Sequence, residues 1–147
     1  MIQRIQTIYL LAVFVLIVQV FIFPFLIFFN EQETIEFSAL RISNGEYLIP
    51  LTILYGVILL ITLVSIFLFK HRLVQARLTV INMFLLFGSI GLVAYYGWEM
   101  SKSLPTHDIK YNFTCLFPIL AIIFNFLALK GIQKDEALVR SANRLRP

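Results

Sequence analysis

The sequence has little charge and almost no cysteine. Asp, Glu, Lys and Arg make up only 14% of its 147 residues, against about 25% in soluble domains. The single cysteine, Cys115, excludes an intrachain disulfide and a cysteine-cluster metal site, and we interpret it as a small buried hydrophobe. Apolar residues make up 60% of the chain, and Phe alone occurs 15 times. A soluble chain of this length could not bury so many apolar side chains, so the composition excludes a soluble globular enzyme.

Motifs of an intramembrane enzyme are missing as well. The sequence contains no HExxH, no GxSxG, no paired intramembrane aspartates and no cysteine–histidine set. We therefore expect a protein that is not an enzyme, with no catalytic residue, no cofactor and no metal ligand. No Asp, Glu, Lys, Arg or His lies in the middle of an apolar stretch. This argues against a proton-coupled transporter, because proton relays use ionisable groups within the membrane.

Four apolar stretches are long enough to cross a bilayer as helices. A helix rises about 1.5 Å per residue, so about 20 apolar residues cross a hydrocarbon core about 30 Å thick. The predicted spans cover residues 7–29, 47–69, 78–98 and 111–129. The rest forms short connections and a tail over residues 130–147. We therefore predict a single integral membrane domain over residues 1–147, an all-α bundle of four transmembrane helices in a lipid bilayer.

Prolines and one connection add local predictions. Pro24 and Pro118 lie inside the first and fourth spans, where each removes a backbone hydrogen bond and should kink its helix. Pro50 lies in the first turn of the second span, where the missing N–H costs little. The connection over residues 30–46 alternates partly and contains Asn44-Gly45, a dipeptide typical of tight turns. It favours a short hairpin that packs on the bundle or on a partner, because an isolated hairpin is marginally stable.

Basic residues divide unequally between the two sides of the predicted bundle. If the N-terminus is cytoplasmic, nine of the twelve Lys and Arg residues fall in the inner segments 1–6, 70–77 and 130–147. An excess of Lys and Arg in short loops marks the cytoplasmic side of a membrane protein. The sequence therefore predicts that both termini are cytoplasmic. The inner segment 70–77 contains no acid, so it either sets the topology or attracts anionic lipid headgroups.

Isolated polar residues within the spans have two interpretations. Gln19, Asn82 and Asn125 are candidate interhelical polar contacts, because amide side chains in hydrocarbon bond across helices. The alternative is that they contact a substrate.

The tail predicts a short amphipathic C-terminal helix. Leu138, Ala142 and Leu145 follow i, i+4, i+7 spacing, and Arg140 and Arg144 fall on another face. A helix this short is marginal alone in water, so it needs a membrane surface, its own bundle or another protein to dock against. The tail has no stacking aromatic residue and no recognised motif, so no nucleic-acid partner is expected.

Three segments of the chain carry a resemblance to a known family. They are residues 1–10 (MIQRIQTIYL), 69–75 (FKHRLVQ) and 132–141 (IQKDEALVRS). In these segments the chain resembles a family of small four-span membrane proteins of Bacteroidetes whose domain has no known function. The resemblance implies a bacterial inner-membrane protein. It transfers no catalytic residue.

All three segments lie at the predicted cytoplasmic face, which leads to a functional hypothesis. We expect a non-enzymatic scaffold or accessory subunit that docks a membrane or cytoplasmic protein partner, or anionic lipid headgroups, through basic side chains. The candidate docking residues are Arg4, Arg72, Arg77, Arg140 and Arg144. A structural rival is that these segments pack on one another and close the base of the bundle. A functional alternative is a small transporter or channel for an uncharged or apolar solute, in which Gln19, Asn82 and Asn125 would converge in one cavity.

Overall fold

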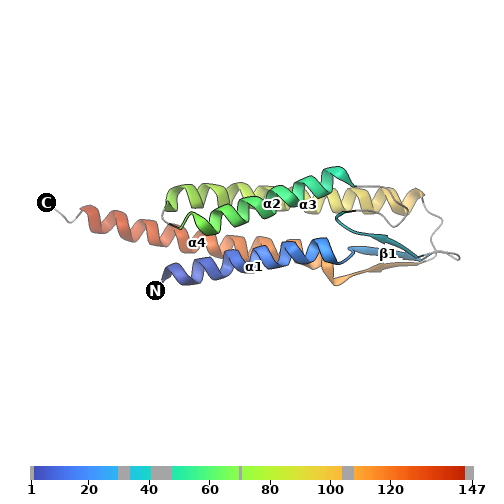
Figure 1. The fold of residues 1–147 in the computed structure, drawn as a ribbon, viewed down its shortest axis with the longest axis horizontal. Coiled ribbons are helices and arrows are strands. Elements are labelled where there is room, and N and C mark those ends of the chain that lie inside the picture. The colour runs from blue at the N-terminus through green and yellow to red at the C-terminus, as the bar shows by residue number, and fades with distance from the viewer. Residues whose placement is uncertain (1, 30–33, 41–47, 70, 104–107, 145–147) are drawn as a thin grey trace.

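A computed structural model describes residues 2–29, 34–40, 48–69, 71–103 and 108–144. It is a long bundle of four helices with a small sheet at one end (Figure 1). The first helix begins and the last helix ends at the opposite end (Figure 1). We call these two ends the sheet end and the termini end.

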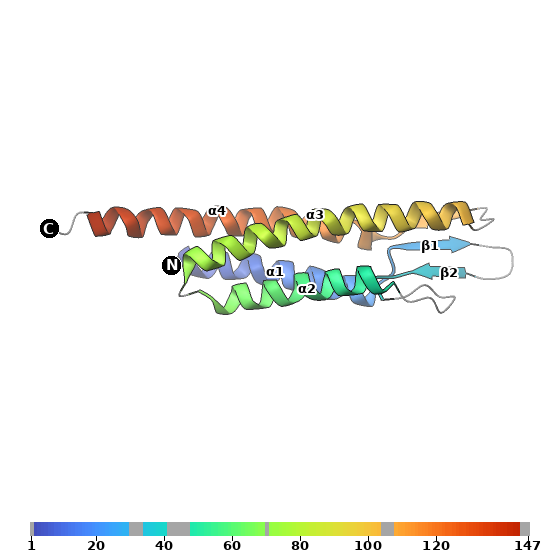
Figure 2. The ribbon, with the colours of Figure 1, turned by 90° about the horizontal axis from the view of Figure 1, so that it is seen from above.

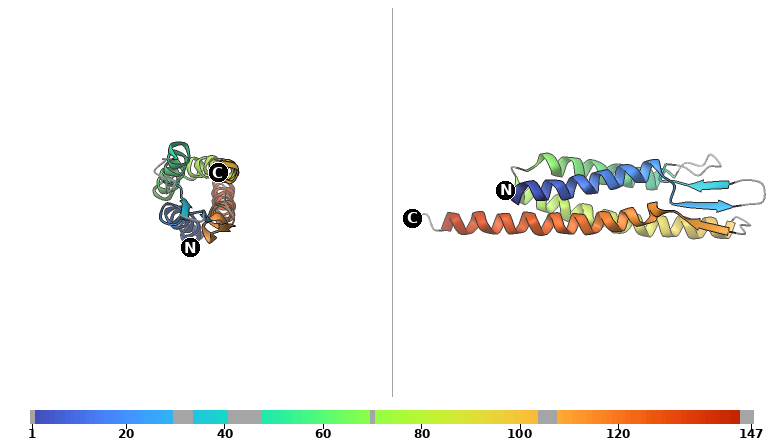
Figure 3. Two further views of the ribbon diagram at one scale, coloured as in Figure 1. Left: turned by 90° about the vertical axis from the view of Figure 1, so that its right-hand side faces the viewer. Right: turned by 90° about the horizontal axis from the view of Figure 1, so that it is seen from below.

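The four predicted helices are present, and each is long and apolar enough to cross a membrane. The structure places them at α1 (Ile2–Ile22), α2 (Ile49–Phe67), α3 (Arg72–Ser103) and α4 (Phe117–Arg144). Each helix packs against its two neighbours in the cyclic order α1, α2, α3, α4, which gives a square when the bundle is viewed along its axis (Figure 3). This is the up-down-up-down topology of a four-helix bundle with short connections.

Buried positions recur on every helix in alternating steps of four and three residues. The buried runs are Gln6, Leu10, Val13, Ile17 and Val20 on α1; Leu51, Tyr55, Ile58, Thr62 and Ser65 on α2; Gln75, Thr79, Asn82, Leu86 and Ser89 on α3; and Ala121, Asn125, Ala128, Ile132 and Asp135 on α4. A mean step of 3.5 residues is the seam of coiled-coil packing. We call these twenty residues the bundle seam.

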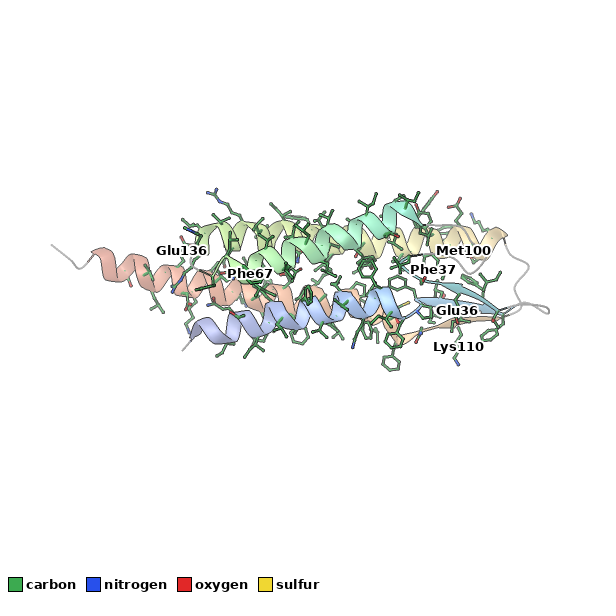
Figure 4. The ribbon with its side chains drawn as sticks, viewed as in Figure 1. Glu36, Phe37, Phe67, Met100, Lys110 and Glu136 are labelled. Atoms are coloured by element: carbon green, nitrogen blue, oxygen red, sulfur yellow. The ribbon has the colours of Figure 1, made fainter. Side chains whose placement is uncertain are left out.

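The outer faces of the helices are apolar and exposed. Ile8 on α1, Ile53 on α2, Phe84 on α3 and Ile123 on α4 are half or more exposed, and side chains point outward along the whole bundle (Figure 4). An apolar belt of this extent is not found on soluble monomers. In a bilayer these side chains contact lipid tails, so the bundle has polar residues in its interior and apolar residues on its surface.

The first predicted span is wrong at its C-terminal end. Helix α1 ends at Ile22 instead of continuing to residue 29, and Pro24 therefore ends the helix rather than kinking it. The last bond in this turn runs from the N–H of Phe23 to the carbonyl of Gln19, at 3.0 Å. Residues Leu26–Phe29 form strand β1. A short apolar run fits a buried strand as well as a helix, which is why hydropathy alone misassigned it.

Strand β1 is the centre of a three-stranded antiparallel sheet. It pairs with β2 (Thr34–Phe37) on one side and with β3 (Asp108–Tyr111) on the other. Phe28 lies opposite Ile35 and Ile109, and its side chain is fully buried. This pairing differs from the hairpin expected within residues 30–46, because the partner of β2 is β1, from the predicted first span. The expected Asn44-Gly45 turn lies outside the described residues.

Boundaries of α3 and α4 also differ from the prediction. Helix α3 begins at Arg72, so most of the predicted basic loop is helical. Helix α4 begins at Phe117 after the 3-10 turn η1 (Phe113–Leu116), so Pro118 lies in its first turn and does not kink it. The expected separate tail helix is the continuation of α4 to Arg144. At the start of α3 and at the end of α4, charged residues end the apolar stretch, but charge does not end a helix.

Strand β1 provides a direct test of the sheet. Replacing Phe28, which is 0% exposed, with Ala should lower the free energy of unfolding by about 3–5 kcal/mol, because it leaves a cavity between the strands and the helices. Its neighbour Phe29 is 39% exposed and lies on the other face, so Phe29→Ala should cost under about 1 kcal/mol. Denaturant unfolding in detergent measures both. Equal losses for the two variants would contradict the observed strand.

Candidate functional site

A buried carboxylate joins three helices near the termini end. Asp135 on α4 is only 5% exposed. Its Oδ2 accepts a hydrogen bond of 2.8 Å from Nε2 of Gln6 on α1. Nη1 of Arg72 on α3 donates to the backbone carbonyl of Asp135 at 3.2 Å and lies 4.0 Å from Oδ2. We call Gln6, Arg72 and Asp135 the termini-end triad.

A missing side chain on α4 makes room for the triad. A Cβ atom at Gly131 would lie 2.8 Å from Cγ of Gln6, closer than real Cβ atoms come to other atoms. Gly131 therefore allows α1 and α4 to approach until the Gln6 amide reaches Asp135, one helical turn further along α4. Ile132, between them, is fully buried. The contact between the two helices is tight at this level of the bundle.

The five predicted docking arginines have different surroundings. Arg72 bonds within the protein, and 27% of its side chain is exposed. This geometry fits the rival hypothesis, in which the basic segments pack on one another. Arg77 is exposed on α3. Arg4 lies on α1 and Arg140 and Arg144 lie on the last turns of α4, but their side chains are outside the described part of the structure.

Two of the three predicted amides bond across helices. Nδ2 of Asn82 donates to Oγ1 of Thr62 at 2.9 Å, which joins α3 to α2. Nδ2 of Asn125 donates to the carbonyl of Thr79 at 3.2 Å, which joins α4 to α3. Gln19 is only half-buried and lies outside this set of bonds. The structure therefore brings Asn82 and Asn125 to the same seam but does not join Gln19 to them.

A further interhelical hydrogen bond from an amide side chain, which the sequence analysis missed, strengthens the same seam. Nε2 of Gln75 on α3 donates to the carbonyl of Ser65 on α2 at 2.9 Å, and both residues are buried. The spacing in the sequence could have indicated this bond, because Gln75, Thr79 and Asn82 recur in steps of four and three and therefore share one face of the helix. The Oδ1 atoms of Asn82 and Asn125 are buried without a hydrogen-bond partner among the described residues.

Asp135 was not singled out in the sequence analysis. It lies well inside α4, which begins 18 residues before it. Its spacing of three residues from the apolar Ile132 could have indicated that it is a buried position of the α4 seam. No group of three His, Cys, Asp or Glu side chains in the described ranges could hold a metal ion.

The packed apolar helices are those of a multi-pass helical membrane protein. Residues 2–145 match the family model "Domain of unknown function (DUF4293)", and the chain belongs to this family. Neither a curated protein nor a solved structure matched the chain.

The triad makes a prediction about stability. Asp135→Ala removes the acceptor for Gln6 and should lower the free energy of unfolding by about 1–3 kcal/mol. Asp135→Asn should lose less, because its side-chain oxygen still accepts from Gln6. The ion pair is long and Arg72 is partly exposed, so the loss of charge should matter less than the loss of the hydrogen bond. Denaturant titration in detergent measures both variants.

Lys134→Ala is the matched control, because Lys134 is exposed on the same turn of α4. If Asp135→Ala unfolds at the same denaturant concentration as Lys134→Ala, the triad does not hold the three helices together.

Proposed function

We propose that this chain is a non-enzymatic scaffold or accessory subunit of a bacterial inner-membrane assembly. Its termini end faces the cytoplasm, and the last turns of α4 bind a protein partner with an acidic surface. The observation that supports this proposal is the projection of α4 beyond the other three helices at the termini end (Figure 2). The outer faces of the membrane-crossing parts of the helices are apolar and contact lipid.

The projecting part of α4 has both of the surface types that a partner would need. After Asp135, the last residue of its seam, the helix continues to Arg144. Leu138 is 52% exposed and Val139 is 47% exposed. Arg140 and Arg144 add positive charge to the same turns, and a guanidinium can engage a carboxylate through two hydrogen bonds. Exposed apolar side chains beside arginines are typical of interface residues.

The direction of the helix favours a protein over a lipid surface as the partner. A membrane-surface helix lies in the plane of the headgroups with its apolar face toward the acyl chains. Helix α4 continues its membrane-crossing path without a break, so its end points along the bundle axis (Figure 2). Leu138 and Val139 are therefore carried away from the hydrocarbon. A protein that stands on the membrane surface can cover them, whereas a flat lipid surface cannot.

The cytoplasmic orientation rests on the distribution of basic residues. Nine of the twelve Lys and Arg residues belong to the segments at the termini end, and such a bias directs a segment to the cytoplasmic side.

Cysteine labelling tests this orientation. In a Cys115→Ser background, Arg144→Cys should react with a membrane-impermeant maleimide only after spheroplasts are permeabilised. Lys102→Cys, at the sheet end, should react in intact spheroplasts and is the matched control. Labelling of Arg144→Cys in intact spheroplasts would overturn the orientation and the cytoplasmic docking with it.

Site-specific photo-crosslinking tests the partner. A photoreactive amino acid at Leu138 should give one discrete protein adduct of higher mass in native membranes. The control position is Leu127, which is exposed on the membrane-crossing part of α4 and should give lipid adducts. The Leu138 protein adduct should weaken when Arg140 and Arg144 are both replaced by Glu, because the partner surface is acidic. Lipid adducts alone at Leu138 would contradict the protein partner.

A further inference from the structure

A cleft lies at the sheet end, between the sheet and α3. Its volume is about 540 Å³, within the range of about 300–1,000 Å³ that small-molecule pockets have. Strand β1 contributes Leu26 and Phe28, α3 contributes Val93, Ala94 and Trp98, and the start of α4 lines the remaining side. Most of this surface is apolar.

The cleft exists because α3 extends further toward the sheet end than the other helices do. Helix α3 continues to Ser103, beside the sheet and past the level at which α1 gives way to β1 (Figure 1). The sheet lies beside the last turns of α3, and the two approach each other closely at Gly97. A Cβ atom at Gly97 would lie 2.9 Å from Cδ1 of Leu26. Around this contact, the small side chains of Ala94 and Ser101 leave the space open.

Aromatic residues place the cleft at the boundary between hydrocarbon and headgroups. Trp98 is 65% exposed and Tyr111 is also exposed, and both line the cleft. Trp and Tyr side chains, which are partly apolar and partly polar, are enriched at the boundary between hydrocarbon and headgroups. The 19 residues of α2 extend over about 29 Å, close to the thickness of the hydrocarbon. An acyl chain of the surrounding leaflet can therefore enter the cleft from the side without passing through water.

A cation lies beside the same aromatic ring. Nζ of Lys102 is 4.7 Å from the centroid of the Trp98 ring. Lys102 is exposed and follows Ser101, a lining residue, so its ammonium group lies where the headgroup of an inserted lipid would be. Lipid tails are as apolar as the cleft wall, so burial of a chain alone gives no preference for one lipid over another. Any preference must come from the headgroup, and the ammonium group favours a negative one.

We propose that this cleft binds one acyl chain of an anionic phospholipid, whose phosphate pairs with Lys102. The site is independent of the partner surface on α4, since it lies at the opposite end of the bundle.

Fluorescence quenching tests the site, because Trp98 is the only tryptophan of the chain. The full-length protein is reconstituted in phosphatidylcholine vesicles with increasing fractions of dibrominated phosphatidylglycerol or dibrominated phosphatidylcholine. Half-maximal quenching should need about fivefold less of the anionic lipid, the preference that one basic residue at a membrane surface provides. Equal quenching by the two lipids would overturn the proposal.

Two pairs of variants separate the cleft from the general lipid surface. Lys102→Gln should abolish the headgroup preference, whereas Lys110→Gln should keep it, because Lys110 lies on the face of the sheet away from α3 (Figure 4). Ala94→Phe should fill the cleft and make quenching simply proportional to the fraction of brominated lipid. Phe87→Leu, at an exposed position of α3 outside the cleft, should behave as the wild type. An unchanged preference in Lys102→Gln or in Ala94→Phe would refute the site.

Discussion

The structure depends on the bundle seam, because the solvent around it is hydrocarbon. In water, the exposed Ile, Leu and Phe side chains would drive the helices together; in lipid they are solvated as well outside the bundle as inside it. Association must then come from close packing and from interhelical hydrogen bonds. The seam supplies both. Four of its five positions on α3 are polar (Gln75, Thr79, Asn82 and Ser89), and Gln75 and Asn82 bond to α2 while Thr79 accepts from α4.

The surfaces at the two ends of the bundle form where the bundle seam ends. At the termini end, Asp135 is the last buried position among the described side chains of α4 and bonds to both α1 and α3, and α4 projects beyond the other helices from there. At the sheet end, α1 stops at Ile22 and the sheet continues from it, whereas α3 runs on beside the strands. A sheet does not interdigitate with a helix as a second helix does, and a cleft remains between them. The two surfaces proposed for binding are thus places where helix-on-helix packing stops.

Prediction from the sequence succeeded where one physical property decides the structure. A run of about 20 apolar residues crosses a bilayer as a helix because only a helix satisfies its backbone there, so the four helices could be predicted. Prediction failed at the ends of these helices. Residues 26–29 are as apolar as the helix before them, and only their pairing with β2 and β3 shows that they are a strand. The charged residues at 70–77 and 130–136 end the apolar stretches but not α3 or α4.

The sequence by itself determined the solvent, the number of spans and the presence of a few amides that must find partners in hydrocarbon, because each of these follows from composition along one helix. Only the tertiary structure decided which partners they found. That Arg72 bonds to Asp135, that Asn125 reaches Thr79, and that Trp98 borders a cleft with Leu26 depends on how segments far apart in the chain are brought together. Hydropathy is a property of single residues, whereas these contacts are properties of pairs, set by the rotation and register of each helix in the bundle.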